Sequence, residues 1–349
     1  MRKLFLAGLV AAIGLGSGVA GQKPASHLNP LIDLHIQKKP IFGLYAPRAG
    51  GGRGGGNRGA APGAAGGGGT VTAQPVLPPP PPPVVRTPAD LAKDALAHPE
   101  SDYIFDGSME GNVERALPAF TELANALGLA GLLAKTPYPH FTQPLVVKTQ
   151  KIAPDPALAI VNIGRQLNVG VSTIVFVGVE SAKEVEQGLA AMRFKSKGGT
   201  RAEDVGGAPA FWGLSESQYK SRADLWPLNP NGELTNWTIV ESKEGLAHIR
   251  EIAAVKGISV LFPGAGTLRG VFSTTNADGS RTRDDAGWEA AIQQVLAACK
   301  EFNVPCGYPA TDADIEMRMK QGFSVFVINF GDAGFKAVEI GRRVSGRDK

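Results

Sequence analysis

The sequence predicts an α/β protein of the (β/α)8 TIM-barrel class. Eight short runs rich in β-branched and aromatic residues recur along the chain, and helical patterns separate most of them. No GxGxxG motif follows the first run, so an open doubly wound sheet that binds a dinucleotide lacks its main sequence signal. Eight β/α repeats therefore favour a closed barrel over an open sheet.

The predicted strands and helices alternate along the chain. The strands are expected within segments 40–47, 102–107, 144–150, 171–178, 236–242, 258–264, 305–310 and 323–330. The helices are expected from the spacing of apolar residues in segments 87–98, 112–128, 155–168, 181–194, 244–255, 286–303, 312–322 and 333–344.

Glycine and proline are too abundant for one folded domain of 349 residues, with 45 and 26 occurrences. Residues 1–21 have a basic start, a short apolar run and small residues before Gln22, which predicts a signal peptide and export to a periplasm or the medium. An uncleaved membrane tether is the alternative, although the run is short and glycine-rich for a stable membrane span. Residues 22–48 are expected to form the start of the barrel, with an N-terminal helix and the first strand, and residues 87–349 the remainder.

Residues 49–86 are predicted to be a disordered insert. They begin with a glycine-rich stretch and end after six consecutive prolines, and neither composition can bury a core. Residues 1–86 carry nine Lys or Arg and a single acid, Asp33, so the remaining residues carry a net charge of −4. The two arginines among these glycines could suggest RNA binding. The folded part, however, has no signature of a nucleic-acid-binding protein, and we expect no nucleic acid as a partner.

The chain has two cysteines, Cys299 and Cys306. Export permits a disulfide, but Cys299 falls in a predicted helix and Cys306 in the strand after it. Two buried free thiols are therefore expected in preference to a bridge.

Catalytic residues of such barrels lie at the carboxyl ends of the strands, and here those ends are polar. The polar residues are Asp106, Ser108, Glu110, Lys148, Gln150, Glu180, Glu241, Thr311, Asp312, Asn329 and Asp332. A helix N-cap is the alternative role, and it suits Ser181, Asp312 and Asp332. It suits Glu241 less well, because glutamate is a poor N-cap and Ser242 stands beside it. Glu241 is therefore the main functional candidate.

The chain resembles the HpcH/HpaI aldolase family of metal-dependent 2-oxo-acid lyases. The matching blocks are "DYIFDG", "VFVGVESAKEVEQGLAAMRF", "TIVESKEGLAHIREIAAVKGISVLFPGAGTL" and "GFSVFVINFGDAGF". The third block is the most specific. Its counterpart in the family holds a glutamate that closes strand five and an aspartate after strand six, and both bind a divalent cation.

The resemblance implies a metal site for Mg²⁺, Mn²⁺ or Co²⁺. Glu241 occupies the first ligand position, and Thr267 stands where the family has its aspartate. The cation would bind a 2-oxo acid such as pyruvate and stabilise the enolate that forms when a carbon–carbon bond breaks. One protein carboxylate with water and substrate can hold magnesium, so the lost aspartate is compatible with activity.

Other family residues are also replaced. The arginine of strand three falls on Lys148, which keeps the charge but loses the planar fork. Asp106 matches the family's acid after strand two, no histidine follows it, and Glu110 is nearest to the missing base. Lys148, Asp106 and Glu110 are thus the candidate catalytic residues. The candidate substrate-binding residues are Gln150, Gly264, Ala265 and Gly266.

Three functions are compatible with these residues. The first is a divergent carbon–carbon lyase that acts on a 2-oxo or hydroxy acid such as pyruvate and on an aldehyde. The second is an enzyme that forms a Schiff base through Lys148. The third is a non-catalytic exported barrel that binds a small acidic ligand or a partner in the cell envelope. The family resemblance also suggests a trimer or a hexamer. All five histidines, including His140, are expected to be structural or solvated.

Overall fold

The computed structural model describes residues 27–48 and 86–347. The predicted signal peptide and almost all of the predicted insert lie outside these ranges. Among the residues that the structure describes, none of the helices combines the length and the apolar character needed to cross a bilayer.

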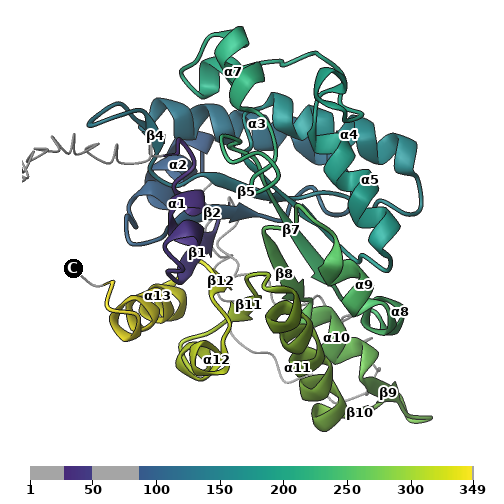
Figure 1. Cartoon of the computed structure of the whole chain (residues 1–349). Helices are drawn as coiled ribbons and strands as arrows, with labels where there is room; N and C mark the ends of the chain where they lie inside the picture. The colour runs from purple at the N-terminus through teal and green to yellow at the C-terminus, as the bar shows by residue number, and fades with distance from the viewer. Residues whose placement is uncertain (1–26, 49–85, 348–349) are drawn as a thin grey trace, which may run out of the picture.

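Eight parallel strands form one sheet that nearly closes into a barrel, as predicted (Figure 1). The order around the sheet is β11-β12-β1-β2-β5-β6-β7-β8. Seven strands lie inside segments predicted from the sequence, and β7 begins one residue before its segment. The strands are β1 (Ile41–Tyr45), β2 (Tyr103–Asp106), β5 (Leu145–Lys148), β6 (Thr173–Phe176), β7 (Thr235–Val240), β8 (Val260–Pro263), β11 (Gly307–Ala310) and β12 (Val325–Ile328).

The barrel closes weakly between its two end strands. The described pairing between β8 and β11 is a single isolated bridge, Leu261 to Cys306, near the amino end of β11. The Phe262 ring of β8 packs directly against Gly307 of β11, where an added Cβ would lie only 2.1 Å from the ring. Side-chain packing therefore closes this seam, with little help from backbone hydrogen bonds.

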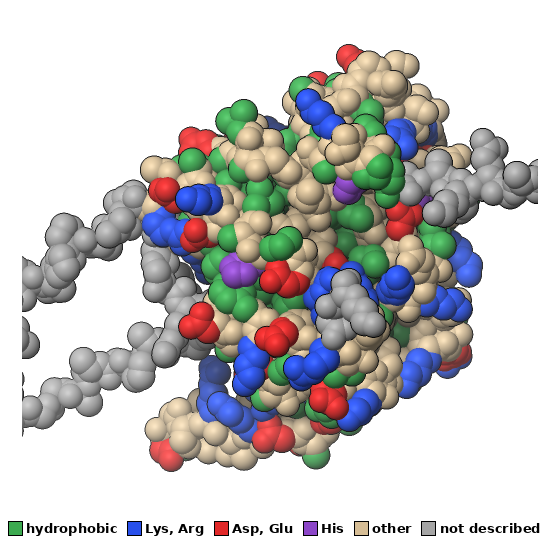
Figure 2. Space-filling model, turned by 90° about the vertical axis from the view of Figure 1, so that its left-hand side faces the viewer, with side chains coloured by type: hydrophobic (Ala, Val, Ile, Leu, Met, Phe, Trp, Pro, Cys, Tyr) green, Lys and Arg blue, Asp and Glu red, His purple; other side chains and the backbone are tan. Residues whose placement is uncertain are grey.

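Helices surround the barrel (Figure 1). Those in predicted segments are α2 (Pro88–Leu96), α3 (Val113–Leu129), α4 (Pro156–Asn168), α5 (Ala182–Met192), α8 (Lys243–Ala247), α9 (Ile249–Ala254), α11 (Asp285–Phe302), α12 (Ile315–Gln321) and α13 (Asp332–Val344). The helix predicted at 244–255 is divided at His248 into α8 and α9. On the side of the molecule at the left of Figure 1, basic and acidic side chains are interspersed (Figure 2).

The helix predicted in residues 22–48 is α1 (Pro30–Ile36), which precedes β1. Several smaller elements had no counterpart in the sequence prediction. One of them is α10 (Ala265–Val271), which follows β8. The others are two hairpins and a long connection before β7: β3 (Leu133–Ala134) with β4 (His140–Phe141), β9 (Ser273–Thr275) with β10 (Arg281–Arg283), and η1 (Lys195–Lys197), α6 (Ala208–Phe211) and α7 (Glu216–Arg222).

Three residues were expected to cap helices. The Ser181 hydroxyl accepts a hydrogen bond from the Glu184 amide and caps α5, as predicted. Asp312 does not cap α12, because that helix starts three residues later, with Asp314 at its N-cap position. Asp332 is the first residue of α13, after Gly331 at the N-cap. The capping predictions for Asp312 and Asp332 were therefore wrong.

Aromatic residues fill the interior of the barrel. The Tyr103 ring meets the Trp237 ring edge-on with centroids 5.0 Å apart, and the Trp237 ring lies 5.3 Å from that of Phe262. The Tyr103 hydroxyl donates a 2.6 Å hydrogen bond to the Phe326 carbonyl, so its polar end is satisfied inside the core. These side chains fill the interior of the barrel, and ligand sites in barrels of this class lie at the carboxyl ends of the strands.

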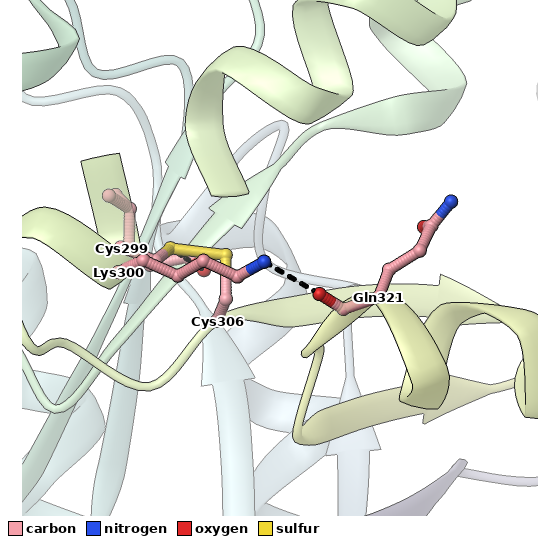
Figure 3. The surroundings of a disulfide bond; sticks show 5 residues. Cys299, Lys300, Cys306 and Gln321 are labelled. Atoms are coloured by element: carbon pink, nitrogen blue, oxygen red, sulfur yellow. Dashed lines mark hydrogen bonds between the residues drawn. A yellow bond between two sulfur atoms is a disulfide. The ribbon is translucent and has the colours of Figure 1, made fainter. Parts of the chain in front are cut away.

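The two cysteines form a disulfide, so the expectation of free thiols was wrong (Figure 3). Their Cα atoms lie 5.6 Å apart although the residues are seven positions apart. Helix α11 ends at Phe302, and Asn303 turns the chain in the left-handed conformation with φ 53°. The turn returns the chain along the helix end and brings Cys306 to Cys299. The disulfide therefore ties α11 to the residue that bridges the seam.

Replacing Cys299 and Cys306 together with alanine should lower the free energy of unfolding by about 2.5 kcal/mol, the loop-entropy value for a loop of this length. The midpoint of urea unfolding, compared with that of the wild type, measures the loss. Reducing the wild type with a phosphine should reproduce the loss and leave the double variant unchanged. Equal midpoints for the oxidised, reduced and double-variant proteins would contradict this role.

The start of the described chain is anchored by Glu233, which is 1% exposed. Its carboxylate accepts hydrogen bonds from the amides of Leu28 and Asn29 at 3.1 and 2.9 Å. The His27 Nδ1 atom lies 3.5 Å from the same carboxylate. The hydrogen bond to Glu233 raises the pKa of His27 against the opposing effect of burial.

Because the pKa of His27 is raised in the folded state, protonation of this ring stabilises the fold below about pH 6.5, the ordinary histidine pKa. The stabilisation is lost as the pH rises through the folded-state pKa. The difference in melting temperature between the wild type and His27→Gln should therefore be larger at pH 6 than at pH 8. If the difference in melting temperature were the same at pH 6 and pH 8, the His27–Glu233 contact would not contribute to stability.

Candidate active site

A cavity of about 620 Å³ lies at the carboxyl ends of the barrel strands. Its walls come from all eight barrel strands and from α10 and α11. The charged residues that line it are Arg48, Glu110, Lys148, Glu241 and Arg269. This position is where barrels of this class carry their ligand sites.

One wall holds an ion pair between the loop after β2 and strand β5. The Lys148 ammonium lies 2.9 Å from a Glu110 carboxylate oxygen, and the two side chains are 15% and 41% exposed. Burial lowers the pKa of Lys148, but Glu110, Tyr45 and Glu241 together raise it above its usual value. Lys148 is therefore a stable cation and not a neutral amine.

Glu241 lies at the end of β7, on the wall next to β8. A Cβ added to Gly264 would lie 2.6 Å from the Glu241 Oε2 atom, so only glycine allows this approach. Ser242 caps α8 with a 3.0 Å hydrogen bond from the Gly245 amide to its hydroxyl. Glu241 therefore has no capping role, as expected, and its side chain lines the cavity.

The turn after β8 completes this wall. Gly264, Ala265, Gly266 and Thr267 all line the cavity, and the Trp288 indole donates a 2.8 Å hydrogen bond to the Ala265 carbonyl. The bond fixes the turn against α11. Thr267 thus lies on the same side of the cavity as Glu241.

Two of the nine predicted site residues do not line the cavity. Asp106 accepts hydrogen bonds from the amide and hydroxyl of Ser108, and burial raises its pKa. The Gln150 side chain accepts from the Val113 amide and donates to the Gly111 carbonyl. Gln150 therefore supports the loop that carries Glu110.

Several lining residues were not singled out from the sequence, namely Tyr45, Arg48, Trp237, Arg269, Trp288 and Tyr308. Tyr45 is the last residue of β1, so the rule of inspecting strand ends could have found it. Asn329, which that rule did identify, also lines the cavity. Each of the five histidines is described by the structure, and none lines the cavity. The His140 ring is hydrogen-bonded to the Tyr138 carbonyl instead.

The oxygen donors at the cavity fit a cation that shares its coordination with a substrate. Within residues 27–48 and 86–347, no three His, Cys, Asp or Glu side chains form a cluster that could hold a metal alone. Glu241 and Thr267 offer a carboxylate and a hydroxyl, which are hard ligands. Magnesium commonly binds one or two carboxylates and completes its shell with water and substrate oxygens.

The fold and the cavity define an α/β barrel with a charged site for a small molecule at the carboxyl ends of its strands. More specifically, the chain belongs to the HpcH/HpaI aldolase/citrate lyase family, whose sequence model matches residues 122–335. The family resemblance read from the sequence is therefore confirmed. The match starts within α3, so it does not include β1 or β2.

Two relatives are similar in sequence. A hydroxypyruvate/pyruvate aldolase from Paraburkholderia phytofirmans is 27% identical over 163 residues, covering 46% of this chain and 58% of the relative. A protein of the same name from Delftia acidovorans is 30% identical over 172 residues, covering 48% and 56%. The chain thus matches little more than half the length of these relatives.

Solved structures share the fold at low identity. A HpcH/HpaI aldolase/citrate lyase family protein from Burkholderia cenocepacia J2315 matches with a TM-score of 0.57 and 20% identity, covering 86% of this chain and 92% of that chain. The citrate synthase SbnG matches with a TM-score of 0.54 and 15% identity, covering 91% and 95%. These likenesses confirm the predicted barrel.

Proposed function

We propose that this protein is a carbon–carbon lyase of the aldolase type. Its substrates would be a 2-oxo or hydroxy acid such as pyruvate and an aldehyde. The family membership and the names of the two relatives support this reaction class. The observation that carries the proposal is the position of Glu241 beside the Gly264–Thr267 turn, on a cavity that also holds the Lys148–Glu110 pair.

The reaction requires stabilisation of an enolate. In the cleavage direction a base removes the proton of the 4-hydroxyl group, the C3–C4 bond breaks to release the aldehyde, and the electron pair of that bond moves onto the 2-oxo oxygen to form an enolate. The enolate then takes up a proton at C3 to give pyruvate. A divalent cation such as Mg²⁺, Mn²⁺ or Co²⁺, held by Glu241 and Thr267 with water, would polarise that carbonyl. The Lys148 ammonium provides fixed positive charge in the same cavity.

Glu110 is the better placed of the two acids considered for proton transfer. It lines the cavity and lies against Lys148, whereas Asp106 is bonded to Ser108 and does not line it. We therefore assign the proton-transfer role to Glu110. The raised pKa of Lys148 disfavours the Schiff-base alternative, since that chemistry requires a neutral amine.

We further propose that the protein acts after export, in a periplasm or in the medium. The signal-peptide pattern of residues 1–21 supports this location. A disulfide persists in such compartments and is rare in the cytosol, so the Cys299–Cys306 bridge is consistent with it. Assembly as a trimer or hexamer is proposed from the family resemblance alone.

The proposed function is tested by following pyruvate formation from 4-hydroxy-2-oxo acids, and the reverse condensation with aldehydes, in the presence of each cation and of a chelator. Cation-dependent turnover would support the lyase. A protein that binds pyruvate without turnover under every condition would instead be a non-catalytic binding barrel. The replaced family residues, Thr267 and Lys148, make that second function the relevant alternative.

A further inference from the structure

A second fixed cation lies on the cavity wall that α10 and α11 form. The Arg269 side chain lines the cavity, and its guanidinium carbon lies 3.7 Å from the centroid of the Trp288 ring. Stacking of this kind fixes the plane of the guanidinium. Trp288 is itself held by its hydrogen bond to the Ala265 carbonyl. Arg269 is therefore positioned by the same residue that fixes the turn beside Glu241.

Arg269 keeps hydrogen-bonding capacity for a ligand. Its Nη1 group donates to the Asp285 carboxylate, and the two side chains are 36% and 70% exposed. A guanidinium has five N–H donors in a planar fork, so one contact leaves others available. An exposed ion pair such as this contributes little free energy, which means that a better-enclosed anion can compete for the arginine.

The strands next to the two fixed cations are not neighbours in the barrel. Lys148 ends β5 and Arg269 follows β8, and the strands between them are β6 and β7. Three interstrand spacings correspond to about 14 Å along the wall. Glu241, at the end of β7, lies between the two cations. A three-carbon acid bound between Lys148 and Glu241 would leave the Arg269 end of the cavity open.

We propose that Arg269 binds an anionic group at the end of the substrate remote from the 2-oxo acid. The protein would then prefer substrates with a carboxylate or phosphate tail to those with a neutral tail, which makes Arg269 a specificity-determining residue. A stacked guanidinium suits this role because it binds carboxylate and phosphate oxygens in pairs. The inference rests on the proposed function, since the 2-oxo-acid end must bind near Glu241.

Three probes with one 2-oxo-acid head test the proposal by calorimetry in the presence of Mg²⁺. They are 2-oxopentanoate with a neutral tail, 2-oxoglutarate with a carboxylate tail and 2-oxo-4-phosphonobutanoate with a phosphonate tail. The wild type should bind at least one anionic probe about tenfold more tightly than 2-oxopentanoate. The probe with the greater advantage identifies carboxylate or phosphate as the tail.

Arg269→Gln should lose that advantage and keep its affinity for 2-oxopentanoate. Arg250→Gln is the matched control, because Arg250 also pairs with a carboxylate, that of Glu301, and lies over an aromatic ring, that of Phe302, but outside the cavity. Equal affinity of the wild type for all probes, or an advantage that survives in Arg269→Gln, would overturn the role of Arg269 alone. Failure of all three probes to bind would overturn the proposed 2-oxo-acid site as well.

Discussion

Replacing Glu241 with glutamine is expected to reduce kcat/KM for aldol cleavage by at least about 10²–10³-fold, the range found when one electrostatic group is removed from an active site. The amide keeps the shape of the side chain but loses the negative charge that a divalent cation requires. The loss should be accompanied by loss of cation binding in the presence of pyruvate, measured by calorimetry. The melting temperature should change little, because Glu241 lies at the cavity and not in the core.

Glu180→Gln is the matched control for this change. Glu180 also follows a barrel strand, β6, but it does not line the cavity. It should therefore retain wild-type turnover and cation binding. If Glu180→Gln reduced activity as much as Glu241→Gln, the loss would reflect a general effect of negative charge at the barrel mouth, which would contradict a specific role for Glu241.

Replacing Lys148 with methionine should lower kcat by about 10²–10³-fold, because it removes the fixed positive charge beside Glu110. Lys148→Arg should recover part of the rate, since it restores the charge with a different shape. Lys148 and Glu110 contact each other, so their effects should not be independent. The reduction of kcat in the double variant Lys148→Met with Glu110→Gln should be smaller than the product of the two single reductions. Steady-state kinetics of the three variants measure this coupling.

Lys151→Met is the control, since Lys151 follows the same strand but lies outside the cavity. The raised pKa of Lys148 also predicts that borohydride will trap no covalent adduct with pyruvate. A trapped adduct that disappears in Lys148→Met would contradict the assignment of Lys148 as a permanent cation. It would favour Schiff-base chemistry in its place.

The alternation of side chains along strands explains which site residues the sequence could predict. Trp237 and Ile239 alternate along β7, Glu241 continues the alternation directly after it, and all three line the cavity. In β2 the same alternation directs Phe105 and Gly107 inward, so Asp106 between them does not line the cavity. The position of each strand end therefore identifies candidate residues, but the alternation of side chains along the strand decides which of them face the cavity.

Other features depended on contacts that no local pattern specifies. The disulfide needs the left-handed turn at Asn303, which an asparagine permits but does not require. Arg269 and Trp288 belong to two different helices, and they meet only because α10 and α11 pack together beside the seam. The eight strands were predictable because each is a short run of apolar residues, which is a local signal.

The most direct test of the proposed site is calorimetric titration of Mg²⁺, Mn²⁺ and Co²⁺ into the protein with and without pyruvate. Because Glu241 and Thr267 provide only part of a coordination shell, the site predicts weak cation binding alone and binding at least about tenfold tighter with pyruvate. Pyruvate should in turn bind more tightly with the cation by the same factor. Cation affinity that pyruvate does not change, or absence of binding in both conditions, would contradict a metal-assisted 2-oxo-acid site at this cavity.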